Sequence, residues 1–584
     1  MRKMALPVTA LLISTAYAQV PDTPAGRQFN AWRAAQDSGD RATIQQYLDK
    51  NFPHGRVEQE LAIHNQTGGY DVKRVEQSSD LHIVVLVQER NPPRQFARAT
   101  MDVEAAEPHQ IAGIRVQNTQ PPPDLAPPKI TPAEIEAARK GAPFRQFSAW
   151  LEAFDSQDKD RMAKFLETNF PSMKLDAQMN FRERTGGFEL RAIEQATATS
   201  VTGLVQERES DQFARFTVVV EAEPPNRIVR FPIQAIPRPA EFPVAPMSDA
   251  ELATALRARL EKETAADRFA GAVLVTHNGK VVFSGAYGLA DRAKKAPNTL
   301  DTRFRIGSMN KMFTATSVLQ LVQVGKIKLG DPLGRYITDY PNQDIATKVT
   351  IHQLLTHTGG TGDFFGPEFD AHRLELKTLN EYVNLFGKRG PAFEPGSRYA
   401  YSNYGMLLAG VVIERVTGQS YYDYVAEHVY KPAGMRLTGS QAENEPVSGR
   451  SVGYMRARGG SDWVPNTDTL PYRGTSAGGG YSTVGDLVKF ADALMGHKLL
   501  NAENTALLIT GKVDSGGGRM YAYGFEDGRG KDGSGAVGHG GGAPGMNGDL
   551  RIFPQSGYTV AVLSNLDPPA AGQISGFVEL RLPK

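Results

Sequence analysis

Hydrophobic positions change their spacing along the chain, and each change predicts a different element. In residues 29–35 (FNAWRAA) the apolar side chains recur at the spacing of one helix face. The run 82–87 (HIVVLV), apolar throughout from 83, is typical of a buried strand. The same order returns later, with a helical pattern in 147–154 and a strand-like run in 216–220. Helices followed by an antiparallel sheet indicate an α+β unit.

Shared strings show that this first part of the chain is duplicated. Residues 27–32 (RQFNAW) recur as 145–150 (RQFSAW), and 67–70 (TGGY) recur as 185–188 (TGGF). The string LVQER also occurs once in each copy, at the same interval. This interval is much longer than the period of a solenoid. We therefore expect two tandem copies of one α+β domain.

Proline-rich segments separate the copies from each other and from the rest of the chain. They fall in 121–136 and 237–247, and such segments favour extended, semi-rigid linkers. After each segment a helix-capping pattern, Thr or Ser with Glu three residues later, starts at Thr131 and at Ser248. The predicted domains are two α+β repeats at 19–120 and 137–236 and a last domain at 248–584.

The last domain opens and closes with predicted strands. Two apolar runs, 272–276 and 281–284, flank an Asn-Gly pair, which is the strongest short signal for a hairpin. Two further runs, 549–553 and 558–563, lie near the C-terminus, and helical patterns fill the stretch between. We expect an antiparallel sheet built from both ends of the domain, with helices inserted in the middle.

Composition narrows the possible functions. The 584 residues carry a net charge of +1 and no cysteine. The charge gives no reason to propose a nucleic-acid partner, and the lack of cysteine excludes disulfides and thiol chemistry. Residues 1–18 are typical of a secretory signal peptide, because Arg2 and Lys3 precede a short apolar stretch and a small-x-small cleavage site. We expect an exported protein, periplasmic or extracellular, with no transmembrane anchor.

Three short strings carry the candidate chemistry: SMNK at 308–311, YSN at 401–403 and HGG at 539–541. Residues three apart share one face of a helix, so Lys311 is expected one turn from Ser308. A serine hydroxyl needs an adjacent base to act as a nucleophile, and a desolvated lysine can supply one. Each string alone is common by chance, but the three in this order within one domain form a strong signal.

Together the strings resemble the active-site elements of serine β-lactamases and penicillin-binding proteins. The Tyr-x-Asn form of the second string is similar to the class C β-lactamase-related branch. This resemblance implies the β-lactamase/transpeptidase fold, an antiparallel sheet flanked by helices, over 248–584. It also implies that Ser308 is the nucleophile and that Lys311 and Tyr401 move protons.

The same resemblance assigns substrate-binding roles. Asn403 would hydrogen-bond a substrate amide, and His539 would orient or polarise the substrate. Gly541 and Gly542 would let the strand lie against the substrate, and the N–H of Gly542 would complete an oxyanion hole with that of Ser308. Near the second string, His352 and His357 are interpreted as structural, and Asp363 as part of the pocket rim.

The two repeats resemble the cone-shaped nuclear-transport-factor-2-like fold, in which a curved sheet wraps a helix. Trp32 and Trp150 are then expected in the core. The repeats could be spacers, dimer contacts or a ligand-binding platform, and the sequence does not decide among these roles or set the oligomeric state.

The sequence therefore predicts an exported serine hydrolase that works through an acyl-serine intermediate on a small-molecule or peptide substrate. The preferred hypothesis is a peptidase or amidase of the D-alanyl-D-alanine carboxypeptidase or D-aminopeptidase type. The alternatives are a carboxylesterase or weak β-lactamase of the same fold, and a non-catalytic binding protein that kept the fold. His539 stands where β-lactamases carry Lys-Thr-Gly, which lowers the expectation of efficient antibiotic hydrolysis. No metal or organic cofactor is implied.

Overall fold

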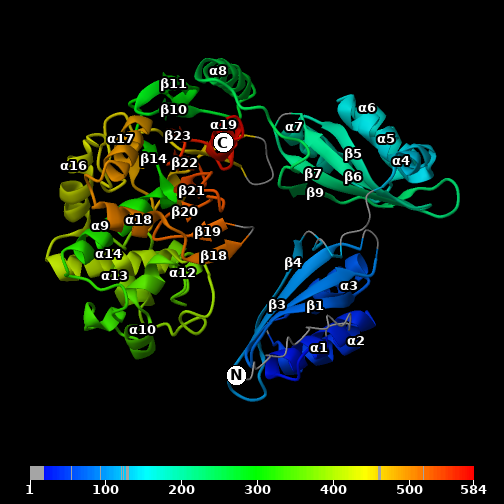
Figure 1. Ribbon diagram of the computed structural model, residues 1–584, viewed down its shortest axis with the longest axis horizontal. Helices are drawn as coiled ribbons and strands as arrows, with labels where there is room; N and C mark the ends of the chain where they lie inside the picture. The colour runs from blue at the N-terminus through cyan, green and yellow to red at the C-terminus, as the bar shows by residue number, and fades with distance from the viewer. Residues whose placement is uncertain are drawn as a thin grey trace, which may run out of the picture. The chain divides into compact units, whose positions relative to one another are not determined.

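The computed structural model describes residues 19–583, except 54, 92–93, 120, 123, 126–129, 209, 458–461 and 517–518. The predicted signal peptide, residues 1–18, lies outside the described residues. The chain divides into two compact units, Met1–Pro243 and Val244–Lys584 (Figure 1). No helix among the described residues is both long and apolar enough to cross a bilayer.

The first half of the first unit consists of three helices followed by a four-stranded antiparallel sheet. Side-chain caps start its first two helices, because Thr23 accepts from the N–H of Gly26 and Asp40 accepts from that of Thr43. The strand order follows the chain. The elements are α1 (Pro24–Ser38), α2 (Arg41–Asn51), α3 (Val57–Thr67), β1 (Tyr70–Ser78), β2 (His82–Glu89), β3 (Phe96–Val103) and β4 (Ile111–Thr119).

The second half of this unit has the same order of elements, with one more helix at its start. The capping box predicted at Thr131 is present, and it starts this helix at Pro132, inside the segment predicted as linker. The last strand is split in two, and both pieces pair with β7. The elements are α4 (Pro132–Lys140), α5 (Ala142–Asp155), α6 (Lys159–Asn169), α7 (Leu175–Thr185), β5 (Phe188–Ala196), β6 (Ser200–Glu207), β7 (Phe213–Val220), β8 (Ile228–Arg230) and β9 (Ile233–Ile236).

The shared Thr-Gly-Gly string makes the turn from the last helix to the first strand in each half. Gly69 and Gly187 have φ of +88° and +87°, in the region that favours glycine. A Cβ at either position would overlap a carboxylate, that of Asp37 or Asp155, which accepts the N–H of the next residue. The two shared tryptophans are 2% and 1% exposed, which confirms that they are core residues.

The second unit contains an eight-stranded sheet in the order β11-β10-β23-β22-β21-β20-β19-β18, and every strand pair in it is antiparallel. Strands from the start and the end of this unit lie side by side in the sheet, where β10 pairs with β23, as the sequence predicts. The sheet strands are β10 (Gly271–His277), β11 (Lys280–Tyr287), β18 (Val513–Gly516), β19 (Arg519–Tyr521), β20 (Glu526–Asp527), β21 (Val537–Ala543), β22 (Met546–Phe553) and β23 (Tyr558–Ser564). Shorter strands are β12 (Leu289–Asp291), β13 (Ala296–Pro297), β14 (Phe304–Arg305), β15 (Tyr454–Arg456), β16 (Trp463–Pro465) and β17 (Tyr481–Ser482).

Helices cover both faces of this sheet (Figure 1). On one face, Val273 and Val562 pack with apolar side chains of α8 and α19, the first and last helices of this unit, in one core cluster. Their sequence neighbours Ala272 and Leu563 face the larger cluster of the inserted helices. This alternation is the period of two expected for a strand buried on both faces. The helices are α8 (Asp249–Ala265), α9 (Asn310–Gln323), α10 (Gln343–Lys348), α11 (Ile351–Leu355), α12 (Pro367–His372), α13 (Leu379–Phe386), α14 (Asn403–Thr417), α15 (Tyr421–Val425), α16 (Lys431–Ala433), α17 (Val484–Met495), α18 (Ala502–Ile509) and α19 (Ala570–Glu579).

Candidate active site

Ser308 lies in the short 3-10 turn η1 (Gly307–Met309) that leads into the buried helix α9. The preceding residue, Gly307, has a φ of +51°, and a Cβ there would come within 3.1 Å of the amide nitrogen of Gly542. The N–H of Ile306 donates to the carbonyl of Gly480 at 2.8 Å. The turn is thus fixed between two glycine-rich segments, with its serine half-buried.

Lys311 is completely buried one helical turn after Ser308. Its Nζ lies 3.0 Å from Ser308 Oγ, as the spacing of the first string predicts. It also donates to Asn403 Oδ1 at 2.7 Å and to the carbonyl oxygen of Ala477 at 2.6 Å. Two acceptors that carry no proton therefore hold two of its hydrogens, and the serine hydroxyl is its third neighbour.

Burial lowers the pKa of Lys311 from 10.5 to about 7, and the negative charge of Asp363 acts weakly against this change. The cause is that burial removes water that would stabilise the ammonium form. Near neutral pH a large fraction of the side chain is therefore a neutral amine. With two hydrogens directed at Asn403 and Ala477, the lone pair of this amine faces the hydroxyl of Ser308.

Tyr401 and Asn403 lie at the start of α14, where Ser402 caps the helix by accepting from the N–H of Gly405 at 2.8 Å. The ring of Tyr401 has its centroid 4.7 Å from Lys311 Nζ. Desolvation raises the pKa of Tyr401, while a hydrogen bond with the Ser308 side chain lowers it. The tyrosine hydroxyl therefore stays protonated at neutral pH, next to the candidate nucleophile.

Asp363 fixes the orientation of Asn403. Its Oδ2 accepts from the backbone N–H and the side-chain Nδ2 of Asn403, at 3.2 and 2.9 Å. Its Oδ1 accepts from the backbone N–H groups of Phe364 and Phe365. Because Asn403 Nδ2 is bound to this carboxylate, its Oδ1 is turned toward Lys311.

The third string lies on strand β21, beside the serine turn. Gly541 is in close contact with that turn, because a Cβ would overlap the carbonyl oxygen of Ile306. Asn547 on β22 donates to the carbonyl of Gly541 at 2.9 Å and holds the strand edge in place. The next residue, Gly542, is exposed and has its amide close to Gly307.

His539 is buried, with 4% of its surface exposed. Its Nδ1 donates to the carbonyl of Gly540, so its Nε2 accepts from the hydroxyl of Tyr521 at 3.0 Å. Burial lowers the pKa of His539, and the imidazole is therefore neutral. Its ring centroid is 6.4 Å from that of Tyr401. Both ring nitrogens have protein partners, so this histidine is held within the wall of the site.

The structure thus gathers all seven residues that the sequence singles out. It adds three groups that the motifs did not predict as parts of the site: the carbonyl of Ala477, the hydroxyl of Tyr521 and the ring of His357. Asp363 was predicted at the pocket rim, and it acts through Asn403. The described residues contain no group of three His, Asp or Glu side chains that could hold a metal ion.

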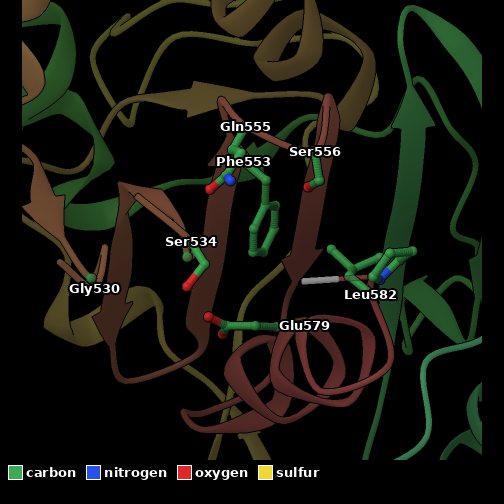
Figure 2. Close-up of a pocket in the computed structure, with 10 residues that line it drawn as sticks. Gly530, Ser534, Phe553, Gln555, Ser556, Glu579 and Leu582 are labelled. Atoms are coloured by element: carbon green, nitrogen blue, oxygen red, sulfur yellow. The ribbon is translucent and has the colours of Figure 1, made fainter. Parts of the chain in front are cut away.

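A separate cavity of about 250 Å³ lies away from these residues (Figure 2). Figure 2 shows Phe553 from β22 and Glu579 from α19 pointing toward the same space. Its lining contains none of the predicted site residues. The full lining is Gly528, Gly530, Ser534, Gly535, Phe553, Gln555, Ser556, Glu579, Leu582 and Pro583.

Comparison with known proteins agrees with this geometry. The family model described as Beta-lactamase matches residues 256–581, more than half of the chain. The chain belongs to the β-lactamase family. Its relatives include penicillin-binding proteins and an esterase, and the protein is an enzyme of this serine-hydrolase type.

Three relatives illustrate the range of the family. PbpX of Bacillus subtilis (strain 168), assigned to the penicillin-binding proteins, is 30% identical over 315 residues, which cover 53% of this chain and 74% of PbpX. Esterase EstB of Burkholderia gladioli is 34% identical over 204 residues, 32% of this chain and 52% of EstB. The crystal structure of a penicillin-binding protein from Bacillus halodurans matches 55% of this chain and 99% of its own, with a TM-score of 0.51 and 32% identity.

Proposed function

We propose that the protein is an exported serine hydrolase in which Ser308 is the nucleophile and Lys311 the base that activates it. The observation that carries this proposal is the environment of Lys311. A lysine with a pKa of about 7, 3.0 Å from a serine hydroxyl, has a lone pair available at neutral pH. A general base works best when its pKa lies near the operating pH.

In the acylation step, Ser308 Oγ forms a bond to the substrate carbonyl carbon while its proton moves to Lys311 Nζ. The carbonyl oxygen becomes an oxyanion, which the N–H groups of Ser308 and Gly542 would stabilise. The bond from carbon to the leaving nitrogen or oxygen then breaks. The leaving group takes a proton delivered by Lys311 through Tyr401, whose hydroxyl remains protonated at this pH.

Water completes the cycle. It attacks the acyl-serine carbonyl, and its proton moves to the same base. The ester bond to Ser308 breaks, the serine regains its proton, and the product acid leaves. Asn403 has its side-chain nitrogen engaged by Asp363 and its oxygen engaged by Lys311. We therefore assign it first to holding Lys311, with the contact to a substrate amide as a second role.

For the substrate, we propose a peptide or amide bond next to a D-amino acid, as in cell-wall peptides. The likeness to PbpX and to the Bacillus halodurans protein, both assigned to the penicillin-binding proteins, supports this class. Ester hydrolysis is the second candidate. It is favoured by the likeness to EstB and by Phe365, which is 59% exposed next to Asp363 and offers an apolar contact beside the site.

The test is a substrate panel on purified protein. It compares D-aminoacyl anilides, a D-alanyl-D-alanine peptide, p-nitrophenyl butyrate and a chromogenic cephalosporin, with Ser308→Ala as the matched control. Turnover of the D-amino-acid substrates well above that of the ester supports the peptidase assignment, and the reverse order supports the esterase. A fluorophosphonate should add one adduct, located on Ser308 by peptide mapping. Labelling of a different serine, or equal turnover by Ser308→Ala, would remove Ser308 from the mechanism.

We further propose that the two halves of the first unit are copies of one nuclear-transport-factor-2-like domain. Their matching element order and their Thr-Gly-Gly turns support this assignment. Their interiors are filled by apolar side chains. In the second copy the ring centroids of Phe147 and Phe216 are 3.9 Å apart, and those of Trp150 and Phe154 are 4.5 Å apart. A filled interior favours a spacer or docking role over a small-molecule pocket. We also propose that residues 1–18 direct export and are then removed, and mass spectrometry of the mature N-terminus tests this proposal.

A further inference from the structure

His357, just after α11, combines three unusual features. It has a φ of +58°, in the left-handed region that only a few per cent of residues other than glycine adopt. It is 1% exposed, although histidine is a polar residue. Its Nε2 has no hydrogen-bond partner within the described part of the chain. A residue in a sparsely populated conformation with an unpaired buried polar atom persists where the surrounding structure imposes it, and such residues gather at functional sites.

The contacts of His357 hold the segment that carries Tyr401 on both sides. Its carbonyl accepts from the N–H of Ala400 at 2.9 Å, and its Nδ1 accepts from the N–H of Ser402 at 3.1 Å. The two donors are the residues immediately before and after Tyr401. One histidine therefore fixes the backbone of this tyrosine at both flanking peptide groups.

The imidazole also packs against the side chain of Tyr401. The two ring centroids are 4.4 Å apart, and the ring of Tyr521 lies 4.6 Å from His357 on another side. Tyr521 in turn donates to His539 on β21. His357 is thus in contact with both tyrosines of a four-ring cluster, defined by His357, Tyr401, Tyr521 and His539, in which Tyr401 is exposed and the other three rings are buried.

We propose that His357 is a positioning residue that sets the hydroxyl of Tyr401 against Ser308. This inference rests on the proposed function, because it is there that Tyr401 receives its proton-transfer role. The described contacts of His357 do not include Ser308, and its side chain is buried. It acts through Tyr401, and the part of it that matters most is the acceptor nitrogen Nδ1, which the N–H of Ser402 requires.

Two substitutions distinguish the contribution of the acceptor nitrogen of His357 from that of its ring. His357→Phe keeps an aromatic ring against Tyr401 but leaves the N–H of Ser402 without an acceptor. His357→Asn loses the ring, keeps an acceptor oxygen close to the position of Nδ1, and tolerates a positive φ. The matched control is His352→Phe. His352 lies on α11, and its Nδ1 bonds to the hydroxyl of Tyr523 at 2.8 Å, outside the four-ring cluster.

The experiment measures kcat and KM for p-nitrophenyl butyrate and the rate of fluorophosphonate labelling in the full-length protein. His357→Phe should lower kcat by ~10- to 100-fold with little change in KM, the scale for a displaced catalytic group. His357→Asn should recover most of this loss, and His352→Phe should match the wild type. In a Tyr401→Phe background, His357→Phe should have almost no further effect, because both changes remove the same hydroxyl function.

An equal loss from His357→Phe in both backgrounds would overturn the inference, because the histidine would then act independently of Tyr401. So would wild-type kcat in His357→Phe. If His357→Phe does not fold, the same measurements are made with His357→Asn and His357→Ala, each with Tyr401 and with Tyr401→Phe. The proposal is supported if kcat falls only in His357→Ala, and only when Tyr401 is present. A wild-type protein without labelling at Ser308 would instead refute the proposed function, and this inference with it.

Discussion

The pH dependence of acylation is the sharpest test of Lys311 as the base. Burial brings the pKa of this lysine from 10.5 to about 7, a difference of about 5 kcal/mol in favour of the neutral amine at 1.36 kcal/mol for each pH unit. The side chain is fully buried, so solvent screening does not reduce this figure. At pH 7 about half of the molecules would hold a neutral Lys311, against about one in 3,000 at the ordinary pKa of a lysine.

The expected rate profile follows from which form is active. Only the neutral amine can accept the serine proton, so the rate should rise about tenfold for each pH unit below about 7 and level off above it. Burial lowers the pKa of His357 and His539, and it raises the pKa of Tyr401. These shifts move all three pKa values away from pH 7, so we assign the rising part of the rate profile near pH 7 to Lys311.

The assay is the second-order rate of fluorophosphonate labelling between pH 5 and pH 9.5, with circular dichroism at each pH to confirm the fold. Asp363→Asn provides a second measurement, because the charge of Asp363 raises the pKa of Lys311. Removal of this charge should move the rising part of the pH–rate profile to lower pH. A rate that climbs tenfold for each unit through pH 9, or a limb that moves upward in Asp363→Asn, would refute the reasoning.

Two further predictions concern individual residues. Lys311→Ala and Tyr401→Phe should each lower turnover by at least ~100-fold, the usual contribution of a general acid–base group, with the fold intact by circular dichroism; turnover close to wild type in either variant would remove that residue from the mechanism. Gly541→Ala should lower both the melting temperature and Ser308 labelling, because its Cβ would overlap the carbonyl of Ile306. Gly572→Ala, inside α19 and with open space at its Cβ, should leave labelling unchanged and should not lower the melting temperature.

The sequence predicts those parts of the site that depend on local spacing. A spacing of three residues along a helical turn brings Lys311 beneath Ser308, and the distance of 3.0 Å between Lys311 Nζ and Ser308 Oγ agrees with that expectation. The carbonyl of Ala477 could not be predicted, since a backbone acceptor has no side-chain signal and its partner is far away in the chain. The role of His357 was also missed, because it depends on a backbone conformation and on two distant N–H groups.

The fold shows the same division between local and long-range information. The Asn-Gly hairpin between β10 and β11 is confirmed, with positive φ at Asn278 and Gly279, and so are the two capping boxes. Strands β18, β19 and β20 were not predicted. They have two to four residues each, so their local pattern is weak, and their pairing at the end of the sheet depends on contacts made elsewhere.

The domain organisation leads to a final prediction, that residues 244–584 fold alone and label at Ser308. Both apolar clusters of this unit are formed by residues between 247 and 582, and both end strands of its sheet belong to it. The Bacillus halodurans protein, matched over 99% of its length, is a solved chain of about this extent.

Labelling rates and melting curves of the fragment and of the full chain provide the measurement, with Ser308→Ala in the fragment as the control. An insoluble fragment, or a folded fragment that does not label, would show that the first unit completes the catalytic domain. If the fragment labels at the full-chain rate but loses turnover of a cell-wall peptide, the repeats contribute to recognition of that substrate. Equal turnover would leave them with a spacer role, which is the outcome expected from their filled interiors.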